Sequence, residues 1–100
     1  MKHLAFEWDP NKNQRNIAAH GISFEEARSS FYDEYARLIP DVLHSEHEER
    51  FLILGYSTHG RLLTVCHCYR LNDEIIRIIS ARKATKSEHK QYINFKGREL

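Results

Sequence analysis

Two arginines occupy positions from which they could hold a phosphate group. Arg61 stands at the start of one apolar, strand-like run, and Arg82 stands at the end of the next. In an antiparallel pair both would lie at the same end of neighbouring strands, and two guanidinium groups there could clamp a phosphate. The alternative for each is an ordinary surface arginine paired with a carboxylate. The spacing alone leaves both interpretations open.

A histidine in the same run could supply proton transfer. His67 has the same side-chain parity as Arg61, so both side chains should leave one face of that strand. An imidazole there could act as a general acid or base near neutral pH. The alternative is a histidine buried in the sheet and satisfied by a backbone or hydroxyl partner.

Positive charge gathers toward the end of the chain. The formal charge of the whole sequence is only +1, but after Asn72 seven basic residues accompany four acidic ones. Such a stretch could contact a nucleic acid even though the net charge does not predict it. Tyr92 could stack on a base or donate a proton, or it could be a core aromatic. The candidates for phosphate contacts are Arg77, Lys83, Lys86 and Lys90.

Arg77 differs from Arg82 in one respect. In a regular strand the two residues have opposite parity and point to different faces, unless a bulge intervenes. We therefore interpret Arg77 as a contact residue for phosphate or for a partner protein, and not as a catalyst.

The metal-binding residue types show no recognised metal-site pattern. His44 and His47 lie in an acidic segment with no further ligand at a recognisable spacing, and Cys66 and Cys68 lack the spacing of zinc sites. We expect neither a metal nor a cofactor. Both cysteines should leave the same face of one strand, which is a poor geometry for a bridge and favours a reduced, cytoplasmic setting.

Capping signals define the elements that must position these residues. After a short strand over 4–8, Asp9 and Pro10 are typical of a helix start, and Gly21 is typical of its end. Ser23 and Glu26 form a capping-box pattern that opens a second helix, with an apolar face made by Phe24, Ala27 and Phe31.

The remaining elements follow from apolar runs. Strands are predicted over 35–39, 51–56, 62–69 and 75–81, with turns at 57–60 and 71–73 and an exposed connection over 41–50 that contributes nothing to the core. A second capping-box pattern opens a helix near Lys86, with Tyr92 and Ile93 on its inner side. This order predicts an α+β fold in which the two leading helices pack on one face of an antiparallel sheet.

Length and hydropathy fit one small soluble domain. A chain of 100 residues with 41 % hydrophobic side chains can build one modest core, so we expect a single domain over 1–100. No apolar run approaches the roughly 20 residues that a membrane-spanning helix needs, and no signal-peptide pattern follows Lys2.

Two blocks of this sequence resemble the BrnT toxin family. The first contains Phe6-Glu7-Trp8-Asp9, then Lys12 and Asn16, and HGISFEEA over 20–27; the second reads IRIISARKAT over 76–85. Together they are more specific than either block alone, and the resemblance spans 4–92.

The resemblance implies a fold and an activity. The fold would be a RelE-like twisted antiparallel sheet with two N-terminal helices on one face, a short C-terminal helix and RNA cleavage on the other face. The activity would be that of a metal-independent endoribonuclease, in which the RNA 2′-hydroxyl attacks the adjacent phosphate. The implied catalytic residues are Arg61, His67, Arg82 and Tyr92, and the basic residues named above would bind RNA.

The resemblance also implies partners and leaves alternatives. A BrnA-like ribbon-helix-helix antitoxin would neutralise the toxin, and operator DNA would be bound only through that complex; no membrane partner is expected. A non-catalytic RelE-like module is the other class, acting as a topoisomerase inhibitor or as an operator co-repressor. RNA cleavage by the purified chain in excess chelator would separate these classes.

Overall fold

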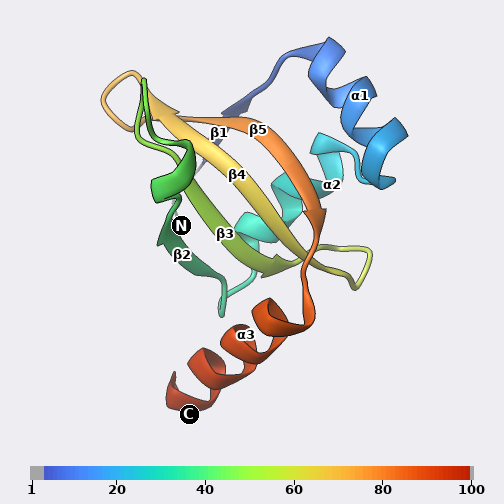
Figure 1. Cartoon of the computed structure of the whole chain (residues 1–100), viewed down its shortest axis with the longest axis vertical. Coiled ribbons are helices and arrows are strands. Elements are labelled where there is room, and N and C mark those ends of the chain that lie inside the picture. The colour runs from blue at the N-terminus through green and yellow to red at the C-terminus, as the bar shows by residue number, and fades with distance from the viewer. Residues whose placement is uncertain (1–3, 100) are drawn as a thin grey trace.

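A five-stranded sheet forms the centre of the computed structural model, which describes residues 4–99 (Figure 1). The strand order is β1-β5-β4-β3-β2. Neighbours from β2 to β5 are antiparallel, and β1 joins the outer edge of β5 in parallel. The expected α+β fold is confirmed. The strands are β1 (Ala5–Glu7), β2 (Arg37–Pro40), β3 (Phe51–Tyr56), β4 (Leu62–Arg70) and β5 (Ile75–Lys83).

The first helix has the limits that its caps predict. Helix α1 (Pro10–His20) begins after Asp9, whose side chain accepts a hydrogen bond from the Asn11 backbone, and ends at Gly21 with φ of 70°. That left-handed conformation is easiest for glycine. Two other helices and two short 3-10 turns complete the chain, namely α2 (Phe24–Ser29), η1 (Ser30–Tyr32), η2 (Val42–His44) and α3 (Lys86–Glu99).

The two capping-box patterns have different outcomes. At α3 the box is complete, because Thr85 Oγ1 accepts from the Glu88 backbone at 3.1 Å and Glu88 accepts from the Thr85 backbone at 2.8 Å. At α2 only half of it forms: Ser23 Oγ accepts from the Glu26 backbone at 3.0 Å. The Glu26 carboxylate points instead toward the β3–β4 hairpin, so the prediction of a second contact, between this carboxylate and the Ser23 backbone, is wrong.

Different helices pack against the two faces of the sheet. We call the face that bears Leu63 and Val65 the α2 face, because Phe24 and Ala27 of α2 pack on it; the opposite face, where Leu54 and Leu62 meet Tyr92 of α3, is the α3 face. The expected packing on one face is observed for α2, whereas α1 contacts β5 through the side chain of Asn16, which is hydrogen-bonded to the backbone of Ala81. The core on the α2 face consists of Ile22, Phe24, Ala27, Ile53, Leu63, Val65, Ile78 and Ala81.

A bulge changes which side chains share a face. Cys66 pairs with Ser80 but His67 pairs with Ile78, so Ile79 is an extra residue in β5. As a result Arg77 lies opposite Cys68 and Arg82 lies opposite Thr64, and both arginine side chains project from the α3 face. A regular strand would have placed the two on different faces.

Two expectations about burial are wrong. Asp41, in the connection that should have contributed nothing to the core, is buried; it accepts from His44 Nδ1 at 2.9 Å and faces the Cys66 thiol. Burial and the Asp41 carboxylate raise the pKa of Cys66 to about 11. On α3, Tyr92 is buried as expected, but Ile93 is 63 % exposed because it points away from the sheet.

Candidate functional site

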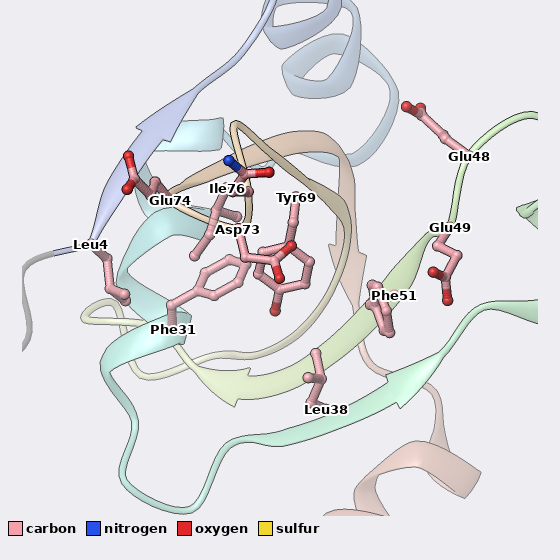
Figure 2. Close-up of a pocket in the computed structure, with 11 residues that line it drawn as sticks. Leu4, Phe31, Leu38, Glu48, Glu49, Phe51, Tyr69, Asp73, Glu74 and Ile76 are labelled. Atoms are coloured by element: carbon pink, nitrogen blue, oxygen red, sulfur yellow. The ribbon is translucent and has the colours of Figure 1, made fainter.

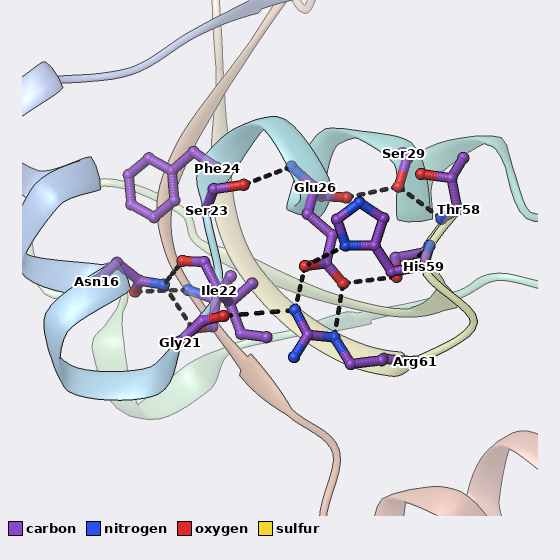
Figure 3. A network of polar contacts seen from close by, with 12 residues as sticks. Asn16, Gly21, Ile22, Ser23, Phe24, Glu26, Ser29, Thr58, His59 and Arg61 are labelled. Carbon is purple, nitrogen blue, oxygen red and sulfur yellow. Dashed lines mark hydrogen bonds and ion pairs between the residues drawn. The ribbon is translucent and has the colours of Figure 1, made fainter.

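A buried carboxylate organises the junction between α2 and the β3–β4 hairpin (Figure 3). The side chain of Glu26 is only 2 % exposed. It accepts hydrogen bonds from Ser57 Oγ at 2.7 Å and from Arg61 Nε at 3.0 Å, with a second, shorter contact from Arg61 Nη2. His59 Nδ1 lies 3.1 Å from the same carboxylate. Three hairpin side chains therefore meet on one acidic group.

Local hydrogen bonds fix the hairpin against the helix. The Ser57 backbone donates to the Arg61 carbonyl at 2.9 Å, and the Gly60 backbone donates back to the Ser57 carbonyl at 2.9 Å. Gly60 has φ of 73°, which suits glycine in the turn. Ser29, at the end of α2, accepts from the Thr58 backbone at 3.0 Å. The hairpin that carries the polar side chains is thus tied to α2 by backbone as well as side-chain contacts.

The Glu26 carboxyl group stays charged in this environment. Burial by itself raises the pKa of Glu26, but the hydrogen bonds from Arg61 and Ser57 and the nearby positive charges outweigh burial. The net result is a pKa below the ordinary value. The same contact with Glu26 raises the pKa of Arg61. Glu26 is therefore a fixed negative group that holds the Arg61 guanidinium and contacts the His59 ring at the surface.

Part of the His59 side chain and part of the Arg61 side chain face solvent. His59 is 62 % exposed, and Nδ1 is the ring nitrogen turned to Glu26, so Nε2 remains for another partner. Arg61 is 33 % exposed; Nε and Nη2 contact Glu26, and Nη2 also reaches the Gly21 carbonyl at 3.4 Å. Nη1 of Arg61 donates no hydrogen bond within residues 4–99. A guanidinium and an imidazole thus offer free donor or acceptor atoms beside one another.

Lys83 adds charge on the same side of the sheet. Lys83 pairs with Leu63, so its side chain projects from the α2 face, as that of Leu63 does. Arg61 precedes Leu63 by two residues and therefore lies on that face diagonally from Lys83. Register therefore places Arg61 and Lys83, two of the residues predicted from the sequence, at the same end of the same sheet face.

Arg82 lies on the other face. Its side chain projects from the α3 face beside Thr64, and its two terminal nitrogens contact the Glu88 carboxylate at 2.7 and 3.0 Å. Burial alone would raise the pKa of Glu88, but hydrogen bonds from Arg82, Thr85 and Thr64 lower it to about 2. Arg61 and Arg82 stand at the same end of adjacent strands, as expected, but the structure does not bring their guanidinium groups to one phosphate position.

His67 has the geometry of a core residue. It is fully buried, its ring centroid lies 4.8 Å from that of Phe31, and its nitrogens contact the Val65 carbonyl and the Tyr69 hydroxyl at 3.1 and 3.3 Å. Burial lowers the pKa of His67 to about 4. It shares the face of Arg61, but six residues of strand put roughly 20 Å between them. The structure does not bring the two together.

The other predicted site residues are dispersed. Tyr92 is buried and donates to Asp33 Oδ2 at 2.7 Å; burial and that hydrogen bond raise the pKa of Tyr92. Arg77 pairs with Glu7 of β1 at 2.8 Å. Lys86 and Lys90 are exposed on the first turns of α3.

Sequence reasoning missed Glu26 and His59. The capping-box pattern assigns another role to Glu26, and the turn signal over 57–60 assigns Ser57 and His59 only to a loop. No signal in the sequence indicates that this turn folds against α2, because Ser57 and His59 lie in the turn and not on an alternating strand.

The described part of the chain contains neither a metal-ligand cluster nor a membrane-spanning helix. Within residues 4–99, no group of three or more histidine, cysteine or acidic side chains is arranged to hold a metal ion. Over the same residues, no helix has the length and apolar character needed to span a bilayer.

Comparisons with known proteins give one family and one fold. The model of the family described as the ribonuclease toxin BrnT of type II toxin-antitoxin systems matches residues 8–88. The crystal structure of the Brucella abortus ribonuclease toxin BrnT is similar with a TM-score of 0.62 and 23 % identity, covering 84 % of this chain and 100 % of that one. No curated protein sequence matches the chain.

Proposed function

Because this chain belongs to the BrnT family of ribonuclease toxins from type II toxin-antitoxin systems, we propose that it cleaves RNA without a metal ion. In this reaction the RNA 2′-hydroxyl attacks the adjacent phosphorus, and the bond to the 5′-oxygen breaks. The protein must accept one proton, supply another and stabilise the charge that grows on the phosphate. Basic and proton-transferring side chains are sufficient for these tasks.

One observation carries the assignment of the site: a single buried carboxylate, Glu26, holds Arg61 and His59 side by side at the surface. Arg61 would bind the phosphate through Nη1, and His59 would move a proton at Nε2. Glu26 is a positioning residue, since a charged carboxylate at Nδ1 favours the ring form that leaves Nε2 as the exchanging nitrogen. Lys83 would add a phosphate contact on the same face.

This site differs from the one that the family resemblance implied. That resemblance placed cleavage on the sheet face opposite the two leading helices, where Arg82 lies. Both terminal nitrogens of Arg82 donate to the Glu88 carboxylate, so we propose that Arg82 anchors the start of α3. The exposed Lys86 and Lys90 would then extend the surface that attracts RNA.

The proposed partners follow from the type II family. We propose that a BrnA-like ribbon-helix-helix antitoxin neutralises this chain in the cytoplasm, and that operator DNA is bound only by the pair. A toxin that acts on the RNA of its own host requires a partner that blocks it until release.

The test is cleavage of a long, end-labelled RNA by the purified chain in excess chelator. We expect fragments that end in a 2′,3′-cyclic phosphate, because attack by the 2′-hydroxyl forms that ring. His59→Gln is the test variant. His44→Gln is its matched control, since His44 is also an exposed histidine held by a buried carboxylate, Asp41, but lies over the α3 face. Intact RNA with wild-type protein would refute the ribonuclease, and loss of cleavage only in His44→Gln would move the site to the α3 face.

A further inference from the structure

An open pocket occupies the α2 face at the end of β4 remote from Arg61 (Figure 2). Its volume is about 1180 Å³. Three aromatic rings, Phe31, Phe51 and Tyr69, form much of its lining, and Leu4, Leu38 and Ile76 complete the apolar part. Neither α1 nor α2 contributes a lining residue, so this end of the face is left open.

Apolar groups at this pocket remain in contact with water. Leu38 is 49 % exposed although it lies in β2, a strand at the edge of the sheet. Tyr32, which follows the lining residue Phe31 in the chain, is 59 % exposed. Apolar side chains that gather at one pocket on a small protein mark an interaction site more often than isolated apolar residues do.

The rim of the pocket is acidic. Four carboxylates line it and no basic residue does. Glu48 is paired with Arg50 and Arg70, at 3.5 and 3.4 Å, but the other three make no ion pair among residues 4–99. Those three are Glu49, Asp73 and Glu74. Such a rim repels RNA phosphates, so this pocket is distinct from the proposed cleavage site.

The turn that presents part of the rim has an unusual backbone. Leu71, Asn72 and Asp73 have φ of 51°, 56° and 69°, three consecutive left-handed residues without a glycine. That conformation costs free energy for side chains other than those of asparagine and aspartate, and it leaves Leu71 68 % exposed. Costly conformations of this kind cluster at binding sites.

We propose that this pocket docks a cationic, amphipathic segment of a partner protein. Apolar side chains of the segment would fill the aromatic floor, and flanking lysine or arginine side chains would pair with the three free carboxylates of the rim. The volume exceeds the roughly 300–1,000 Å³ usual for small-molecule sites, and the charge selects a basic polypeptide. The identification of that partner as the antitoxin rests on the proposed function. The docking of a cationic, amphipathic segment does not depend on that function, because it rests on the apolar lining and the acidic rim.

The test uses a defined probe and matched variants. The probe is a labelled synthetic peptide of lysine, leucine and phenylalanine at helical amphipathic spacing, and its counterpart has glutamate in place of every lysine. The rim variant combines Glu49→Gln, Asp73→Asn and Glu74→Gln; asparagine is chosen because it tolerates the left-handed backbone. The control variant removes the same charge elsewhere, through Glu25→Gln, Glu34→Gln and Glu46→Gln.

We expect the lysine peptide to bind the wild type and the control variant alike, and the rim variant about ten-fold more weakly at low salt. Its contacts, read from amide NMR spectra, should map to Leu38, Phe51 and Tyr69, and the glutamate peptide should not bind. Equal affinity for the rim variant, or shifts confined to another surface, would overturn the docking site. So would a dimer that Leu38→Thr converts to a monomer, because a second copy would then be the occupant.

The same samples separate this inference from the proposed function. RNA cleavage should be unchanged in the rim variant, because the pocket and Glu26 lie at opposite ends of β4. If the wild type cleaves no RNA but still binds the lysine peptide through the rim, the ribonuclease proposal fails while the docking site is supported.

Discussion

His59 and Arg61 contact the same buried carboxylate. Nδ1 of His59 lies 3.1 Å from Oε1 of Glu26, while Nε of Arg61 donates to Oε2 of the same carboxylate at 3.0 Å. The imidazole ring and the guanidinium fork are thereby kept at a fixed relative position by a carboxylate that is itself buried. Such preorganisation is what lowers a reaction barrier without a cost at the moment of reaction.

Arg61→Ala should lower the RNA cleavage rate by a factor on the order of 100 or more, comparable to the loss of one donor to a charged transition state. Arg61→Lys should recover little, because an ammonium group cannot contact both Glu26 and a phosphate in a planar fork. Single-turnover cleavage measures the effect. Arg28→Ala, another arginine bound to a glutamate of α2, is the control. Wild-type cleavage by folded Arg61→Ala would remove Arg61 from the mechanism.

His59→Gln should lower kcat by roughly 100-fold or more if the imidazole moves a proton in the rate-limiting step. Folding should be little affected, because the His59 side chain is largely exposed. A folded variant that keeps the wild-type rate would show that His59 takes no part.

Arg82→Ala separates anchoring from phosphate binding. Because Arg82 holds Glu88 through two hydrogen bonds, its loss should lower the free energy of unfolding by about 1–2 kcal/mol, while cleavage at a temperature well below unfolding changes little. Urea denaturation and the cleavage assay measure the two effects. A fully stable Arg82→Ala protein with a large loss of cleavage would instead place the phosphate site on the α3 face.

Stability should fall in mild acid because of His67. Its pKa is lowered to about 4 in the folded chain, so the unfolded chain binds a proton more readily. The neutral ring therefore supports folding fully above the ordinary pKa of about 6.5, and this support is lost as the pH falls toward 4. The loss should be of the order of 3 kcal/mol at most. Urea denaturation at several pH values should show this slope in the wild type and a flatter one in His67→Gln; equal slopes would contradict the assignment.

Expression of the chain alone should arrest growth, and co-expression of the proposed BrnA-like antitoxin should restore growth. The Arg61→Lys and His59→Gln variants should be tolerated at the same level of soluble protein. Normal growth of cells that contain the folded wild-type chain would contradict the proposed toxic activity.

The sequence predicts those parts of the fold that local chemistry decides. The limits of α1 follow from Asp9, Pro10 and Gly21, because a cap, a fixed φ and a left-handed residue act within a few positions. The strands of the meander follow from their apolar runs. The same local patterns cannot say that the Glu26 side chain leaves the capping box for the hairpin, since that choice depends on three residues more than thirty positions away.

The site was harder to predict than the fold because it depends on register. Arg61 and Arg82 could be assigned to one end of the sheet from strand order alone, but the pairing of Arg82 with Thr64 decides the face, and a shift by one residue would reverse it. The bulge at Ile79 moves Arg77 to the face of Arg82 for the same reason. Neither register nor bulge leaves a clear mark in the sequence of β5.

The parallel pairing of β1 with β5 has a consequence for how the protein is made. Ala5 pairs with Ile75, and Asn16 of α1 contacts the backbone of Ala81 through two hydrogen bonds. Contacts so distant in sequence cannot form on a ribosome until the later segment has been synthesised, and closing such long loops is entropically costly. Without β5, α1 therefore lacks its contact with the sheet, and the core on the α2 face lacks Ile78 and Ala81. A chain interrupted by early termination should fold poorly and be exposed to proteases, so we expect only nearly complete copies to reach the folded state.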